Sequence, residues 1–230
     1  MTRATTARIA GATFLFYIAM GIATLVLFGR ATVGADIAAR LASAAQELTM
    51  LRVSMITGML SAFSAIVLAT TLYSLTRAVD RELALFGCAC RAGEGIIGIS
   101  TIPTLGVIWL ATQGVDVTAA SSDAMHALAA FLFRVDGWTA SAAAMLFAAG
   151  STSFALAFLR GRLLPPVLAR LGVGASVLLA LLLPVQIAGW IGGTSAFTIM
   201  WMPMLVFEIW LAAWLIVTGA PLPQTNLSTG

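Results

Sequence analysis

The chain has 230 residues, of which 60% are hydrophobic and only 9% are charged. A soluble domain carries about 25% charged residues, so this composition excludes one and indicates that the whole chain belongs to a membrane. Twelve basic residues against 9 acidic ones give a formal net charge of +3. Their positions along the chain do not indicate a nucleic-acid partner. Every basic residue is arginine. The lack of lysine excludes a retinal or pyridoxal Schiff base and a P-loop, and no other cofactor motif is present.

Long runs without a charged residue define the predicted architecture, and they occupy positions 9–29, 53–76, 95–115, 137–159 and 171–207. About 20 apolar residues cross a hydrocarbon core of about 30 Å as an α-helix. The longest run needs a break, which Gly192-Gly193-Thr194-Ser195 supplies. The sequence therefore predicts an all-α polytopic membrane protein, a bundle of six transmembrane helices with spans at about 9–29, 53–76, 93–112, 138–159, 172–191 and 197–218.

The first run follows Arg3 and Arg8 and is too long for a signal peptide, so it is expected to remain as the first helix. Residues 1–220 are expected to form one six-helix domain, followed by a flexible polar tail over 221–230. With six spans, both termini share a side. Eight arginines fall on that side and four on the other, which predicts cytoplasmic termini in a bacterial inner membrane.

Two segments between the spans have the pattern of short amphipathic helices on the outer side. In Asp36–Arg52 the apolar residues share one face, and Asp36 suits an N-cap. The segment Ser122–Val135 has apolar residues at helical spacing before Gly137. Both segments are expected to rest in the headgroup layer or to form a lid over the bundle.

Glu208 is the most informative single residue, because it lies near the middle of the sixth span, where an ionised carboxylate is costly. Two interpretations remain open. As a structural group, protonated Glu208 donates a hydrogen bond to the Ala180 carbonyl, which Pro184 leaves without its helical donor. As a functional group, Glu208 binds a ligand or exchanges a proton. Gln186 extends either network toward the outer side.

Arg91 and Glu94 are three residues apart and share one face at the predicted cytoplasmic entry of the third span. They form either a structural salt bridge at the membrane boundary or an inner gate that contacts an anion. Small residues and Pro103 make this helix easy to kink and suited to lining a cavity.

Four polar residues indicate a candidate outer vestibule: Arg52, His126 and Asp136, together with Glu47. The alternative is that Arg52 reaches to the headgroups and that His126 is an ordinary surface residue. A single histidine leaves too few ligands for a common zinc site, so no metal site is predicted.

Short motifs along nearly the whole chain resemble those of a known family: Arg8-Ile9-Ala10-Gly11, Leu51-Arg52, Leu72-Tyr73, Arg91 with Glu94, Pro166, Leu171-Gly172, Glu208, Trp214-Leu215 and Gly219. The sequence resembles the bacterial multi-pass membrane family catalogued as domain of unknown function number four-three-eight-six. This resemblance implies a six-helix membrane fold and implies no reaction.

Three classes of function are compatible with these residues, and the lipid bilayer is a partner in each. A transporter or sensor would bind a small ligand or lipid in the bundle beside Glu208. An accessory subunit would pack its small-residue faces against a partner membrane protein or a second copy. An intramembrane enzyme would need a nucleophile and a base in reach of each other, and the sequence offers no such set. Binding or transport is the preferred interpretation.

Overall fold

The structure is a computed structural model that describes residues 2–112, 119–191 and 194–219. The described residues form helices and no strand, and six of the helical stretches are long and apolar enough to cross a membrane. This confirms the predicted all-α polytopic bundle. The polar tail expected over 221–230 lies outside the described residues. The helices are, in chain order, α1 (Arg3–Ala31), α2 (Ile37–Gln46), α3 (Leu48–Thr76), α4 (Arg81–Ile99), α5 (Ile102–Thr112), α6 (Ala119–Arg160), α7 (Pro166–Ile187) and α8 (Thr194–Thr218).

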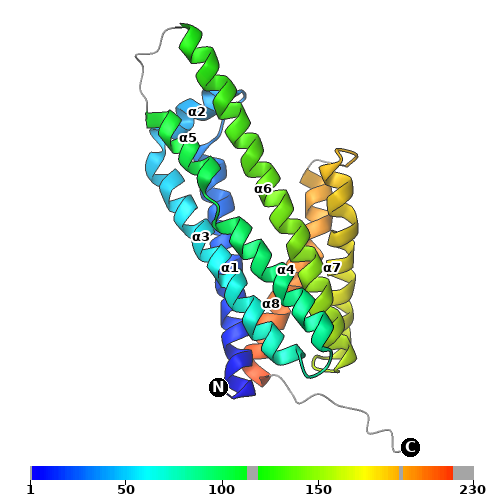
Figure 1. The fold of residues 1–230 in the computed structure, drawn as a ribbon. Helices are drawn as coiled ribbons and strands as arrows, with labels where there is room; N and C mark the ends of the chain where they lie inside the picture. The colour runs from blue at the N-terminus through cyan, green and yellow to red at the C-terminus, as the bar shows by residue number, and fades with distance from the viewer. Residues whose placement is uncertain (1, 113–118, 192–193, 220–230) are drawn as a thin grey trace, which may run out of the picture.

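The spans form a closed ring, in which each helix packs on the next one along the chain. Contacts join α1 to α3, α3 to α4, α4 to α6, α6 to α7 and α7 to α8, and α8 returns to α1. The N-terminus and the end of α8 lie at one end of the ring, and α2 and α5 lie at the other (Figure 1). These two ends are called the terminal end and the α2 end below.

The helices extend beyond the charge-free runs because their polar first and last turns reach past the apolar segment. Thr2 caps α1 by accepting a hydrogen bond from the Thr5 N–H at 3.2 Å, and Pro166 opens α7, where its missing N–H costs nothing. At the terminal end, Asp80 caps α4 and accepts a hydrogen bond from Arg160 of α6 at 2.6 Å. The hydrogen bond from the Leu83 N–H, followed by that from Arg160, lowers the pKa of Asp80.

Only one of the two expected outer helices is a separate element. Asp36 caps α2 as predicted, accepting from the Ala39 N–H at 2.8 Å, although α2 ends at Gln46 and α3 begins at Leu48. The segment Ser122–Val135 is helical but is the first part of the continuous helix α6, which corrects the prediction of a separate helix there. Gly137 does not interrupt α6, because a single glycine inside a long helical pattern weakens the helix without ending it.

The third span is a broken helix. It begins at Arg81, earlier than predicted, and is interrupted at Ser100 and Thr101 between α4 and α5. Pro103 explains the break, since it has no N–H to donate to the Ile99 carbonyl and its ring obstructs a continuous helix. The sequence predicted a kinkable helix here, and the structure separates it into two helices.

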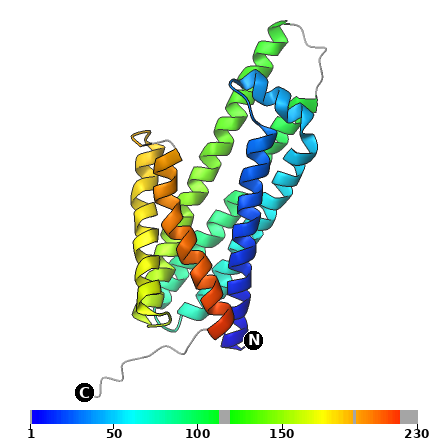
Figure 2. The same ribbon diagram turned by 180° about the vertical axis from the view of Figure 1, so that it is seen from behind.

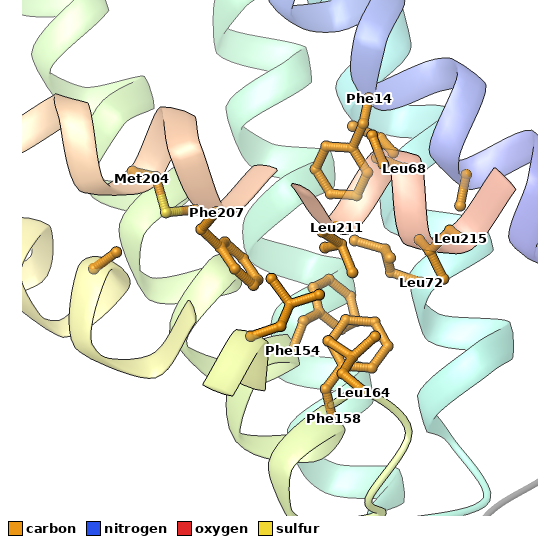
Figure 3. Close-up of a cluster of buried hydrophobic side chains, with 14 of the residues drawn as sticks. Phe14, Leu68, Leu72, Phe154, Phe158, Leu164, Met204, Phe207, Leu211 and Leu215 are labelled. Atoms are coloured by element: carbon orange, nitrogen blue, oxygen red, sulfur yellow. The ribbon is translucent and has the colours of Figure 1, made fainter. Parts of the chain in front are cut away.

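The terminal end is filled by apolar side chains from α1, α3, α6 and α8, shown in Figure 3. This apolar plug includes residues that are at most 4% exposed, namely Phe14, Leu68, Leu72, Phe154, Phe158, Leu211 and Leu215. Toward the α2 end, α8 and α1 diverge (Figure 2). The bundle is tightly packed at the terminal end, and a second buried cluster of Ala31, Ala44, Leu51 and Val107 joins α1, α2, α3 and α5 at the α2 end.

We expect the Gly11→Ala substitution to destabilise the α1–α8 crossing. A Cβ at Gly11 would lie 2.6 Å from the Ala212 carbonyl oxygen, and a backbone atom cannot rotate away. Overpacking of this kind costs about 1–3 kcal/mol. The free energy of unfolding, measured by denaturant titration in mixed micelles, should fall by that amount. Gly29→Ala on the same helix is the matched control, because its Cβ meets nothing within 4 Å; an equal loss in both variants would contradict this packing.

Candidate functional site

Arg91 is the largest fully buried side chain among the described residues, at 1% exposure. Its Nη1 atom lies 2.8 Å from Oε2 of Glu94, so the ion pair predicted from their spacing is present. The pair is not at the entry of the third span, however. Because α4 begins at Arg81, Arg91 lies about 15 Å further along the helix axis. This corrects the prediction of a boundary salt bridge, and a pair inside the bundle is screened much less by salt than an exposed pair.

Aromatic rings from two other helices surround the Arg91 guanidinium. Its central carbon lies 4.9 Å from the Tyr17 ring centroid on α1 and 4.7 Å from the Phe147 ring centroid on α6. The Tyr17 hydroxyl donates a hydrogen bond to Oε1 of Glu94 at 2.7 Å. None of the guanidinium nitrogens makes a hydrogen bond to the described residues, since the approach to Glu94 has unsuitable angles. Cation–π attraction and the ion pair therefore hold Arg91 in place.

Glu208 lies on α8, 5% exposed, within electrostatic reach of Arg91. Arg91, Glu208 and Ser151 line one cavity of about 10 Å³, close to the volume that a single water needs. Oε1 of Glu208 has no hydrogen-bond partner among the described residues.

The predicted hydrogen bond from Glu208 to Ala180 of α7 is not formed among the described residues, because α8 presents a different residue to α7. Phe207 packs there against Gly172, where a Cβ would lie 2.4 Å from the Phe207 ring. Glu208 is the next residue along α8, so it points to a different side of the helix and faces α1, α4 and α6. Because α8 is apolar on all sides, its sequence does not show which face of the helix points into the bundle.

We call Arg91, Glu94, Glu208 and Tyr17 the charge cluster. It contains one permanent cation and two carboxyl groups, so it is electrically neutral when one carboxyl carries a proton. A low-dielectric interior favours neutrality, because an uncompensated buried charge is expensive. The arrangement can therefore hold one exchangeable proton on either of two carboxyls.

A cavity of about 310 Å³ opens from the charge cluster between α1 and α8. Its inner end is formed by Glu208, Tyr17 and two further aromatic residues, Phe147 and Trp201, whose ring centroids are 5.7 Å apart. Toward the outside it is lined by aliphatic residues such as Ile22 and Leu25, which are 51% and 65% exposed. We call this space the α1–α8 cavity. It has an apolar wall that faces the lipid and a carboxyl group at its inner end.

Two overlapping cavities lie on the other side of Glu94, toward the α2 end. One of about 170 Å³ reaches from Glu94 to Thr24, and one of about 360 Å³ continues from Thr24 to Asp136. Hydroxyl groups of α1, α3, α5 and α6 line them, together with the break at Ser100 and Thr101. We call the two together the polar passage.

The structure separates the residues of the candidate outer vestibule. Asp136 lines the polar passage and accepts a hydrogen bond from Thr104 at 3.4 Å. Arg52 is exposed at the start of α3, and the half-buried His126 lies ten residues before Asp136 on α6, about 15 Å along its axis. No hydrogen bond or ion pair joins these three side chains to one another in the described part of the chain. Gln186 is half-buried near the end of α7 and lines neither cavity beside Glu208.

Tyr17 and Phe147 belong to the site but were not predicted from the sequence. Tyr17 is one of only two tyrosines in the chain and lies in the middle of the first span. A buried hydroxyl at that depth needs a hydrogen-bond partner, so its position was an available signal. Phe147 carried no signal, because it is one of 12 phenylalanines in apolar helices.

The fold and the site define a polytopic α-helical membrane protein with a charge cluster between its helices. The chain matches the family described as Domain of unknown function (DUF4386) over residues 9–219, and it belongs to that family. This confirms the resemblance found in the sequence. No curated protein and no solved structure matches the chain.

We expect Arg91→Met to destabilise the protein more than the double substitution of Arg91 and Glu94 by methionine. Removing only the arginine leaves a buried carboxylate unpaired, which costs about 3–5 kcal/mol, whereas replacing both partners by apolar residues is often neutral. Denaturant titration of the two variants in mixed micelles measures the difference. A single variant as stable as the double one would show that Glu94 does not depend on Arg91.

Proposed function

We propose that the protein binds a membrane-dissolved small molecule with an ammonium head group in the α1–α8 cavity. The observation that carries this proposal is a cavity that opens toward lipid and ends at the buried Glu208 carboxyl, whose Oε1 atom has no hydrogen-bond partner among the described residues. Its volume of about 310 Å³ lies at the lower limit of the range of about 300–1,000 Å³ that ligand pockets occupy.

The charges and the rings at the inner end support a cationic head group. Arg91 already has Glu94 as its ion-pair partner, so an ionised Glu208 has negative charge to offer a ligand. Tyr17, Phe147 and Trp201 present aromatic rings beside it, and aromatic faces attract alkylammonium groups. The aliphatic wall between this end and the lipid suits a hydrocarbon tail.

The packing around the cavity supports entry of the ligand from the bilayer. Between Glu208 and the terminal end, α8 contributes Leu211 and Leu215 to the apolar plug, whose side chains are drawn in Figure 3. Above Glu208, α1 and α8 diverge and expose their apolar residues. A ligand that partitions into the membrane reaches Glu208 sideways without crossing water, which suits a sensor or the first step of transport.

The arginine distribution supports placing the terminal end in the cytoplasm of a bacterial cell, with the protein in its inner membrane. Seven of the 12 arginines lie near the terminal end, namely Arg3, Arg8, Arg77, Arg81, Arg160, Arg162 and Arg170, and cytoplasmic segments carry the excess of basic residues. The α2 end then faces the outside.

We expect Gly21→Leu to block binding by filling the α1–α8 cavity. Gly21 lines the cavity, and the nearest atom to a Cβ at this position is Ser61 Oγ, at a distance of 3.7 Å. This is an ordinary van der Waals contact, so the helix tolerates a side chain there. The probe is a long-chain alkyltrimethylammonium with a photoreactive diazirine in its tail, incorporated into lipid nanodiscs. Gly21→Leu and Glu208→Gln should each reduce saturable labelling of the cavity, measured by peptide mass spectrometry, by about tenfold, the effect of about 1.4 kcal/mol in affinity.

Gly29→Leu is the matched control, because its side chain meets nothing within 4 Å and lines no part of the cavity; its labelling should equal that of the unaltered chain. An uncharged alcohol of the same chain length should compete poorly. Equal labelling of all three variants would overturn the proposed site. Recovery of a stoichiometric partner chain with the unaltered protein, and no saturable labelling, would favour an accessory subunit.

A further inference from the structure

The polar passage extends from the charge cluster to Asp136, on the side of the bundle nearer the α2 end. Its two cavities share Gly21, Thr24, Gly58, Gly98 and Ala143, so they are continuous. Asp136 marks the outer part of the passage and Glu94 its inner end. Beyond Glu94 lie Arg91 and the two rings that hold it, followed by the apolar plug. Tyr17, Gly21 and Ser61 line both the passage and the α1–α8 cavity, so the two spaces meet beside the charge cluster.

Hydroxyl groups and two carboxyl groups interrupt the mostly apolar lining of the passage, at a depth where lipid-facing residues are apolar. Thr24 and Thr57 form a hydroxyl–hydroxyl contact of 2.9 Å, and the Ser61 hydroxyl donates to the Tyr17 carbonyl at 3.3 Å. At the break between α4 and α5, the Ile99 carbonyl lacks its helical donor because residue 103 is proline. Non-helical backbone at membrane depth is tolerated where it lines a water-filled cavity. The volumes of about 170 and 360 Å³ hold several waters.

We propose that the polar passage is hydrated and carries protons between its Asp136 end and Glu94. In the transfer, a hydronium ion donates its proton to the Glu94 carboxylate and becomes water. Arg91 keeps its charge and loses its ion-pair partner, and the ionised carboxyl of Glu208, which lines the same small cavity, becomes its counter-charge. Return of the proton to water restores the Arg91–Glu94 pair and leaves the cluster with one net negative charge, which a proton or another cation at Glu208 neutralises.

A proton fits this site better than a metal ion does. Both oxygens of Glu94 are already engaged, Oε1 by the Tyr17 hydroxyl and Oε2 by Arg91. A metal ion would have to displace the arginine, whereas a proton needs no additional volume. The titratable and charged groups that face Glu94 are Tyr17 from α1, Arg91 from its own helix and Glu208 from α8. The residues of α3 and α6 that line the passage beside Glu94 carry no titratable group.

Hydration of the passage is tested by a pair of neighbouring residues on α6. Ala143 lines the passage, whereas Ala142 is exposed on the outside of the bundle, where lipid covers it. Both native cysteines are free, so Cys88 and Cys90 are first replaced by alanine. In proteoliposomes treated with a charged, membrane-impermeant thiosulfonate, Ala143→Cys should react about tenfold faster than Ala142→Cys, because the reactive thiolate forms only in water. Equal rates at the two positions would overturn a hydrated passage.

Proton transfer is tested separately in a chain that keeps both native cysteines. The infrared band of protonated carboxyl groups shifts when the proton exchanges for deuterium. The variants Glu94→Gln and Glu208→Gln each remove one carboxyl group, so they show which part of this band comes from Glu94 and which from Glu208. Ala143→Leu, which narrows the passage, should slow this exchange about tenfold on transfer to heavy water, the effect of about 1.4 kcal/mol in the barrier. Ala142→Leu should leave it unchanged. Exchange that is equally fast in both leucine variants would overturn the route through the passage. The test uses no amphiphile, so its outcome is independent of the ligand proposed above.

Discussion

Burial of the Arg91 guanidinium is the constraint on which the rest of the structure depends. An arginine that is 1% exposed inside a membrane bundle requires counter-charge and polarisable neighbours. Glu94 comes from the same helix, Tyr17 and Phe147 come from α1 and α6, and Glu208 comes from α8. One cation thus gathers groups from four of the six spans. The need to place these groups around the guanidinium fixes the rotation of each helix about its axis, whereas their apolar surfaces alone would pack in several orientations.

The same constraint explains why the two large cavities meet at one place. The α1–α8 cavity ends at Glu208 and the polar passage ends at Glu94, with Arg91 between the two carboxyl groups. If both proposals hold, an ammonium head group at Glu208 and a proton on Glu94 supply the same positive charge. With the ligand bound, two cations balance two carboxylates and the cluster is neutral without the proton. Ligand binding from the lipid would then release a proton toward the α2 end.

The sequence predicted six spans correctly because lipid imposes a length and a composition on them, although the third and fourth begin earlier than predicted, at Arg81 and Asp123. It also identified Glu208, since a lone carboxyl in the middle of a span is conspicuous. It misplaced Arg91, because the third span was taken to begin with the charge-free run that follows Glu94, although a paired arginine is tolerated inside a bundle. It paired Glu208 with Ala180 because packing, and not sequence, decides which way an apolar helix such as α8 faces. The ring neighbours of Arg91 depend on the same packing.

The measurement that tests this account most directly is a double-mutant cycle between Arg91→Met and Glu208→Gln, with the free energy of unfolding as the readout. If Arg91 balances the carboxyl groups of both α4 and α8, Glu208→Gln should relieve part of the loss that Arg91→Met causes. The coupling energy should then exceed about 0.5 kcal/mol, the limit within which independent sites are additive. Additive losses would contradict the account, because Arg91 would then serve Glu94 alone and Glu208 would belong to no charge cluster.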